Sequence, residues 1–200
     1  MEIKPLKKAD HKKAINFCLE GMHMYKYADT KFALNAYGKY FWYLEYTEAT
    51  EILAAYEGDR LLGVLLADMK GEKKPYRSIT KSIYIQIINF VQKYFYKGAK
   101  TIYVDSNNAM YEAYSKVHEP DGEIRLLAAD PDSKVRGIGT FLINELAKRE
   151  AGKEIFLYTD EDCTYQFYDH RGFECVGEND VEIDFTPKVK IKCFLYRKHF

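Results

Sequence analysis

A short turn between a predicted strand and a predicted helix is the feature that most constrains how this chain folds. Residues 123–130, EIRLLAAD, have the apolar content of a strand, and Pro131 ends the run. A helix is predicted over about 137–150, since apolar residues recur there at helical spacing. Its apolar stripe consists of Ile138, Phe141, Leu142 and Leu146. A strand, a polar turn and a helix anchored to a core therefore follow one another directly.

The turn itself, KVRGIG, has the composition of an anion-binding site. The first backbone N–H groups of a helix lack internal partners, and the helix dipole makes that end partly positive, so it attracts phosphate. Gly137 and Gly139 carry no side chain that would keep a ligand away. Lys134 and Arg136 add positive charge, and Thr140 adds a hydroxyl. A loop that uses glycines only to turn is the alternative, but the order of strand, cations and helix favours the anion site.

The spacing of the glycines separates several kinds of phosphate-binding loop. A dinucleotide-binding loop would place a third glycine where this chain has Leu142. A nucleoside triphosphatase would follow Gly139 with Lys and Ser or Thr, where this chain has Thr140 and Phe141. Neither pattern fits.

Two motifs resemble one known family. KVRGIG resembles the Q/R-x-x-G-x-G/A signature of the GCN5-related N-acetyltransferase (GNAT) superfamily, with Lys134 in the first position. FYDHRGF (167–173) resembles the late Y-x-x-x-G-F segment of that superfamily, with Tyr168 in the tyrosine position. The motifs stand in the family's order and at its spacing, and the resemblance is clear over about 123–197.

The resemblance implies an α/β (α+β) acetyltransferase fold, with a central, mostly antiparallel mixed sheet flanked by helices, in a single domain over 1–200. The predicted elements agree in order. Upstream they are a strand at 1–6, helices over about 10–24 (capped by Asp10) and 31–46, and a hairpin over 51–71 that turns at Gly58-Asp59. Downstream they are a strand at 153–160, a short helix over about 163–171, and two strands around Pro187.

One segment departs from the family, because residues 72–122 stand where a short turn is expected. We interpret them as a helical insertion, which is either functional or extra scaffold. A helix is predicted over 77–98, with Gly98 as its C-cap, then an extra strand at 100–105 and another short helix at 109–117. The apolar stripe of the first helix consists of Ile79, Ile83, Ile87, Phe90, Val91 and Tyr94.

That first helix also has apolar residues outside its stripe, namely Ile85, Ile88 and Phe95. We therefore expect it to be sandwiched, with one side on its own domain and the other on a second copy of the chain. A lid over the acceptor is the alternative to this homodimer.

The resemblance also implies the co-substrate, since in the family this loop holds the pyrophosphate of coenzyme A and the preceding strand pairs with the pantetheine arm. Acetyl-CoA is therefore expected, and the N–H groups near Leu127 and Ala128 are expected to stabilise the oxyanion. The predicted binding residues are Leu127, Ala128, Ala129, Lys134, Val135, Arg136, Gly137, Ile138, Gly139 and Thr140. No metal is expected, because the histidines outside the late motif are scattered along the chain.

Two residues are candidates for proton transfer in the acetylation of an amine. Glu123 opens the strand, at the position of the catalytic glutamate in the histone-acetylating branch, and is the candidate base; a solvated Glu paired with Arg125 is the alternative. Tyr168 is the candidate acid that protonates the coenzyme thiolate, and a core Tyr is its alternative in a chain with 18 tyrosines. A nucleophile built from Cys163 and His170 is less favoured.

Aromatic residues of the first two helices bear on the acceptor. Tyr25, Tyr27, Tyr40, Trp42 and Tyr43 either line an acceptor pocket, where they would suit an amine through cation–π contact, or belong to the core, which is favoured. The acceptor is expected to be a primary amine of a small molecule or peptide. A non-catalytic sensor or interaction module that binds coenzyme A is the alternative function.

The composition excludes several other classes of protein. Lys plus Arg and Asp plus Glu both number 30, so the net charge gives no reason to expect nucleic acid or an anionic membrane as partner. The longest strongly apolar run, 61–67, is too short to span a bilayer, and no signal peptide is seen at the N-terminus. Four scattered cysteines predict free thiols and a cytoplasmic location.

Overall fold

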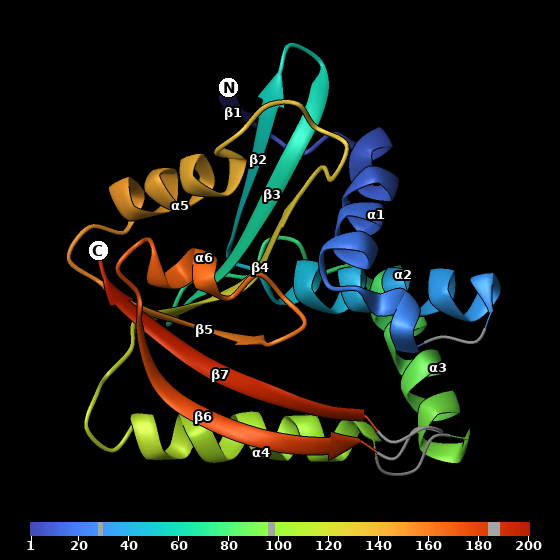
Figure 1. Cartoon of the computed structure of the whole chain (residues 1–200). Helices are drawn as coiled ribbons and strands as arrows, with labels where there is room; N and C mark the ends of the chain where they lie inside the picture. The colour runs from blue at the N-terminus through green and yellow to red at the C-terminus, as the bar shows by residue number, and fades with distance from the viewer. Residues whose placement is uncertain (28–29, 96–98, 184–188) are drawn as a thin grey trace. The chain divides into compact units, whose positions relative to one another are not determined.

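The structure, a computed structural model, describes residues 1–27, 30–95, 99–183 and 189–200 (Figure 1). These residues form two compact units. The first comprises Met1–Ile85 and Ile124–Ala151, and the second comprises Gln86–Glu123 and Gly152–Phe200. Seven strands are hydrogen-bonded in the order β1-β2-β3-β4-β5-β7-β6, which confirms the mixed sheet predicted from the family resemblance.

The first unit is built on a hairpin with helices on both of its faces. Its elements are β1 (Glu2–Lys4), η1 (Lys8–Asp10), α1 (His11–Gly21), η2 (Met24–Tyr27), α2 (Lys31–Glu48), β2 (Glu51–Glu57), β3 (Arg60–Met69), the start of α3 (Ile79–Phe95), most of β4 (Gly122–Ala129) and α5 (Ile138–Arg149). The hairpin of β2 and β3 turns at Gly58-Asp59 as predicted, and Gly58 has the positive φ, 58°, that such a turn requires.

Alternation along the hairpin assigns the two faces. Ala54, Tyr56, Val64 and Leu66 pack with Trp42 and with the buried residues of α1. Gly63, of opposite parity, lies against Ile138 at the start of α5. The helices α1 and α2 therefore cover one face of the hairpin and α5 covers the other (Figure 1).

Asp10 stands just before α1, as predicted, but its side chain does not cap the helix. Its buried carboxylate instead accepts a hydrogen bond from the Tyr56 hydroxyl (2.9 Å) and pairs with Lys13 (2.8 Å). Burial alone would raise the pKa of Asp10, but these two partners outweigh burial and hold the pKa below its ordinary value. The cap is thus replaced by a link between α1 and the hairpin.

Gly63 is where β3, β4 and α5 approach most tightly. A Cβ at this position would lie 2.7 Å from Cγ2 of Ile138 and 3.0 Å from the carbonyl oxygen of Ala128. We expect Gly63→Ala to destabilise the protein by about 1–3 kcal/mol, because overpacking forces the neighbours to shift. The melting temperature should fall by about 2–4 °C for each kcal/mol.

Gly21, at the end of α1, is the matched control for this substitution, since a Cβ there meets nothing within 4 Å. Gly21→Ala should leave the melting temperature unchanged or raise it slightly. Equal melting temperatures for Gly63→Ala and the parent protein would show that β3 and α5 tolerate a wider separation.

The second unit packs one long helix against an antiparallel pair of strands. Its elements are the rest of α3, α4 (Ala99–Tyr114), the first two residues of β4, β5 (Glu154–Asp160), α6 (Gln166–Asp169), β6 (Glu174–Ile183) and β7 (Val189–His199). Met110 and Tyr114 of α4 share a buried cluster with Val181, Ile191 and Leu195, and Figure 1 shows α4 running along β6 and β7. The strands β6 and β7 confirm the predicted pair, while Pro187 itself lies outside the described residues.

Two elements of this unit differ from the prediction. Residues 100–105 form part of α4, so the predicted extra strand is wrong, because the segment continues into a helical stripe that reaches Tyr114. The β-branched residues of this segment misled the prediction. The helix predicted over 163–171 is shorter, Gln166–Asp169, since Cys163 and Thr164 lie in the turn that precedes it.

The insertion forms α3, as predicted, and those side chains of its stripe that the structure describes are exposed. The exposed fractions are 81% for Ile79, 51% for Ile83, 55% for Ile87 and 65% for Phe90. On another side of α3, Tyr84 attaches the helix to α2 by donating a hydrogen bond to the carbonyl oxygen of Ala36 (3.1 Å). Ile85 and Ile88 are half-buried, so the uncovered surface is the stripe. The predicted C-cap, Gly98, lies outside the described residues.

Candidate functional site

The turn that follows β4 is braced by its own polar side chains. The Asp130 N–H donates to the carbonyl oxygen of Leu62 (2.7 Å), and its carboxylate accepts from Arg60 (2.7 Å) and from the Asp132 N–H (3.0 Å). The Ser133 hydroxyl then accepts a hydrogen bond from the Val135 N–H (3.1 Å). These bonds hold the path of the chain from the end of β4 toward α5.

The start of α5 has the backbone geometry that an anion requires. Gly137 is the N-cap, with φ 77°, and no side chain caps the helix there. The Phe141 N–H donates to the Gly137 carbonyl oxygen (2.9 Å), the hydrogen bond with which a helix begins after its N-cap. The earlier amides of α5 point out of the helix end, as at any α-helix N-terminus.

The charged residues of the turn are available to a ligand. Lys134, Arg136 and Gly137 are exposed. Lys134 and Arg136 form no ion pair with the residues that the structure describes. Ile138 is buried and anchors the helix, as its place on the predicted stripe requires. An uncapped helix end, a left-handed glycine and two exposed cations fit a pyrophosphate, so the residues present suit coenzyme A.

The side chains of β4 alternate between two faces. Gly122, Ile124, Leu126 and Ala128 are buried, while Glu123, Arg125, Leu127 and Ala129 are half-buried on the other face. Glu123 pairs in register with Phe156 of the parallel strand β5. This places Glu123 at the second residue of the strand that leads to the turn.

Arg125, the residue that the alternative for Glu123 invoked, contacts a carboxylate of another element. Its Nε lies 2.8 Å from the carboxylate of the buried Glu45 on α2. Glu123 lies near Tyr158 of β5, where burial, and then the charge of Glu123, raise the pKa of the Tyr158 phenol. A protonated phenol therefore accompanies the candidate base.

Tyr168 lies in α6 with its ring among aromatic neighbours. The ring centroid is 5.5 Å from that of Phe173 and 5.9 Å from that of Tyr196. The side chain is half-buried, and within the described residues no hydrogen bond of its hydroxyl is recorded. Burial, and to a smaller extent Cys163, raise the pKa of Tyr168, so the phenol keeps its proton through the neutral range and remains a donor.

Cys163 and His170 do not form a nucleophilic pair. Cys163 lies before α6 and His170 follows its end, so they share no helical face. Burial and the neighbouring Asp160 raise the pKa of the Cys163 thiol to about 12, which disfavours the thiolate that a nucleophile needs. All four cysteines are free thiols, and no metal-binding group of side chains occurs among the residues the structure describes.

The aromatic residues of the first two helices divide between core and surface. Trp42 and Tyr40 are buried, while Tyr25 is exposed. Tyr43 lines a pocket, whereas the side chain of Tyr27 lies outside the described residues. The core interpretation therefore holds for Trp42 and Tyr40, and these residues do not form a common acceptor wall.

Sequence reasoning missed the contacts that support the turn from a distance. Glu45, Arg60 and Gly63 lie far from the motif along the chain, and their roles depend on which strands become neighbours. The glycine in the apolar run LLGVLLA was a possible signal, since a glycine inside a strand often marks a close approach of backbone.

Several solved structures that resemble this chain at low sequence identity are described as acetyltransferases. A protein of Corynebacterium glutamicum described as histone acetyltransferase HPA2 and related acetyltransferase is 17% identical, with a TM-score of 0.58, over 98% of this chain and 94% of that chain. The polyamine N-acetyltransferase of Drosophila melanogaster is 10% identical, with a TM-score of 0.56, over 100% and 99%. An N-acetyltransferase of Staphylococcus aureus is 13% identical, with a TM-score of 0.51, over 98% and 100%.

These likenesses show the fold, and no curated protein matches the chain by sequence. The family itself is shown by a sequence model, that of the acetyltransferase (GNAT) family, which matches residues 20–173. That range includes β4, the turn, α5 and Tyr168. The chain belongs to the acetyltransferase (GNAT) family.

Proposed function

We propose that this protein transfers an acetyl group from acetyl-CoA to a primary amine of a small molecule or peptide. The observation that carries the proposal is the start of α5, where an uncapped helix end, the left-handed Gly137 and the exposed Lys134 and Arg136 coincide with the family's coenzyme motif. GNAT enzymes as a family use acetyl-CoA and act on amine acceptors. A cytoplasmic location is part of the proposal, supported by the free thiols. No helix in the described ranges has both the length and the apolar character to cross a membrane.

The proposed chemistry is a direct attack in a ternary complex. The acceptor ammonium first loses a proton to Glu123, directly or through a water, because only the free amine is a nucleophile. The amine nitrogen then bonds to the thioester carbon, and backbone N–H groups near Leu127 and Ala128 stabilise the oxyanion. The carbon–sulfur bond breaks as the oxyanion collapses, and Tyr168 donates a hydrogen bond or its proton to the departing thiolate. The nitrogen, which gained a positive charge in the attack, releases its extra proton to solvent, or to the tyrosinate where Tyr168 has given up its own proton.

A thiol-release assay tests this function. Acetyl-CoA is mixed with the protein and a panel of small primary amines, polyamines, amino acids and peptides, and free coenzyme thiol is measured. Release that depends on one acceptor class, with intersecting initial-velocity lines, supports direct transfer. Tight binding of coenzyme A without turnover on any acceptor would instead support the sensor or interaction module.

Glu123→Gln separates catalysis from binding within the same assay. The amide keeps the shape of the side chain but cannot accept the proton, so kcat/KM for the amine should fall by about 100-fold or more. The dissociation constant of coenzyme A should stay unchanged. Unchanged kcat/KM would make Glu123 a solvated residue at the start of β4.

We further propose that a second copy of the chain covers the stripe of α3. The stripe is exposed in the isolated chain, while Tyr84 holds another side of the helix on α2. Light scattering should therefore give twice the 23.4 kDa of one chain. Replacing Ile83 and Ile87 by Lys should give the monomer, since charges in an apolar interface are costly to bury.

Ser82→Lys is the control for this experiment, since Ser82 is exposed and polar on the same helix and helical spacing places it away from the stripe. This control should remain dimeric. A parent protein that is monomeric at micromolar concentration would refute the homodimer. The alternative, that α3 is a lid over the acceptor, would then be tested by whether the Ile83 and Ile87 substitutions raise the KM for the acceptor.

A further inference from the structure

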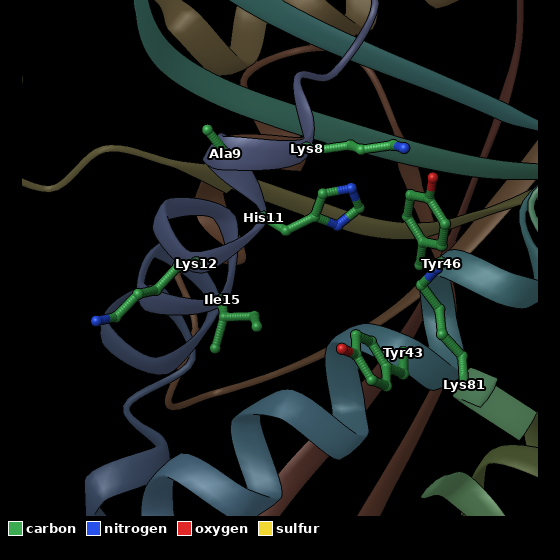
Figure 2. A pocket seen from close by; sticks show the side chains of 8 residues that line it. All are labelled: Lys8, Ala9, His11, Lys12, Ile15, Tyr43, Tyr46 and Lys81. Atoms are coloured by element: carbon green, nitrogen blue, oxygen red, sulfur yellow. The ribbon is translucent and has the colours of Figure 1, made fainter. Parts of the chain in front are cut away.

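A pocket in the first unit is lined by none of the residues proposed to bind coenzyme A or to transfer protons. Its volume is about 470 Å³, and it is bordered by η1, α1, α2 and the first turn of α3 (Figure 2). The polar side chains that line it are Lys8, His11, Lys12, Tyr43, Tyr46 and Lys81. All of them belong to the unit that contains the hairpin, so one compact body forms the pocket.

The lining of this pocket carries an excess of positive charge. It includes three lysines and no carboxylate. Nearby lysines outside the lining are paired, since Lys7 contacts Asp59 (2.6 Å) and Lys13 contacts Asp10 (2.8 Å). Across the described ranges no ion pair is recorded for Lys8, Lys12 or Lys81. A concave surface with unneutralised cations attracts an anion.

His11 is fixed as a hydrogen-bond donor toward this pocket. The indole N–H of the fully buried Trp42 donates to Nδ1 of His11 (3.0 Å), and an indole can only donate, so Nδ1 accepts. Burial and the nearby Lys81 lower the pKa of His11, which favours the neutral ring with its proton on Nε2. Figure 2 shows the ring of His11 directed toward the region where the Lys8 amine and the Tyr46 hydroxyl lie.

Two tyrosines form an aromatic wall beside these donors. The ring of Tyr46 lies 4.9 Å from that of His11, and the Lys81 ammonium lies 4.9 Å from the Tyr46 centroid and 5.7 Å from that of Tyr43. Lys81 is thus held at the wall by cation–π contacts. With Ile15 opposite, the pocket offers apolar and aromatic surface next to its donors.

We propose that this pocket binds the carboxylate or phosphate group of a small organic anion, whose planar or apolar body lies against Tyr43, Tyr46 and Ile15. Lys8, the Tyr46 hydroxyl and the His11 Nε2–H hold the oxyanion, and Lys81 adds a second positive charge. The volume exceeds what a bare inorganic ion needs, and the wall suits an aromatic ring.

The chain contains one tryptophan, which provides a reporter for this site. An anion that accepts from His11 Nε2–H polarises the imidazole and strengthens the bond from the Trp42 indole to Nδ1. Titrations with benzoate and with phenyl phosphate should therefore shift the single indole N–H signal of the full chain downfield, in a saturable manner. Whichever of the two anions binds with the lower dissociation constant identifies the preferred oxyanion, carboxylate or phosphate. Benzylamine, of similar shape and opposite charge, should give no shift.

Two substitutions test the donors without disturbing the buried Trp42. Lys8→Gln removes an exposed charge, and Tyr46→Phe removes only a hydroxyl. Each should weaken benzoate or phenyl phosphate binding by on the order of 10-fold, because hydrogen bonds to a charged group are the strong ones. Lys12→Gln is the matched control, since Figure 2 shows its amine directed away from His11 and Tyr46, and it should change the affinity by less than about twofold.

Three results would overturn the proposal. The first is an indole signal that does not move with either anion at millimolar concentration. The second is a shift that survives both Lys8→Gln and Tyr46→Phe but is lost in Gly137→Asp, which would place the anion at the start of α5. The third is an equal loss of anion affinity in Lys12→Gln and Lys8→Gln, which would assign the binding to non-specific electrostatic attraction by lysines.

Discussion

Gly137→Asp is expected to weaken coenzyme A binding strongly while the chain remains folded. Gly137 has φ 77°, a conformation that Asp and Asn tolerate better than other side chains, and a Cβ there meets nothing within 4 Å. A carboxylate close to the pyrophosphate would cost about 3 kcal/mol at the effective dielectric of a protein surface. Calorimetric titration with coenzyme A should therefore show an affinity loss on the order of 100-fold.

Gly137→Asn is the matched control, because it has the same shape and backbone preference without the charge. It should bind coenzyme A far better than Gly137→Asp. An equal loss in both variants would assign the effect to the side chain's volume, and an unchanged affinity in a folded Gly137→Asp protein would remove the coenzyme from this turn.

Tyr168→Phe is expected to lower kcat by about 10–100-fold with little change in the KM for acetyl-CoA, since it removes the donor but keeps the ring. Burial raises the pKa of Tyr168, so its proton is present well above neutral pH. The ratio of parent to variant kcat should therefore stay constant from about pH 6 to 9.

Tyr165→Phe provides the comparison for this substitution. Tyr165 precedes the same short helix and stacks near Phe194, with ring centroids 4.7 Å apart. Its kcat should match that of the parent protein. A kcat for Tyr168→Phe within twofold of the parent would make Tyr168 a packing residue of the cluster with Phe173 and Tyr196.

The elements that could be predicted are those whose signals are local. The hairpin over 51–71 was predicted from its turn at Gly58-Asp59, and β4 from the apolar content of the run that ends at Pro131. The start of α5 followed from Gly137 and from the apolar stripe behind it. The family could be recognised because two short motifs match its signatures in the right order and at the right spacing.

The elements that could not be predicted depend on partners remote in sequence. Asp10 binds Tyr56 rather than its own helix, because the hairpin brings a hydroxyl to it. Residues 100–105 are helical because they continue into the part of α4 that packs Met110 and Tyr114 into a buried cluster. The stabilisation from this packing outweighs the strand preference of their β-branched residues. The pocket at His11 was invisible for the same reason, since α1, α2 and α3 each supply only part of it.

The close approach at Gly63 also has an evolutionary consequence. Because a Cβ at this position would meet Cγ2 of Ile138, the two positions constrain each other across β3 and α5. In descendants of this chain, a residue larger than glycine at 63 should appear together with a residue at 138 that lacks a γ-branch. Since Ile138 is the first residue of α5, such a paired exchange would also move the helix end that presents its amides to the coenzyme. Drift at a buried strand position would then alter affinity for acetyl-CoA without touching the motif.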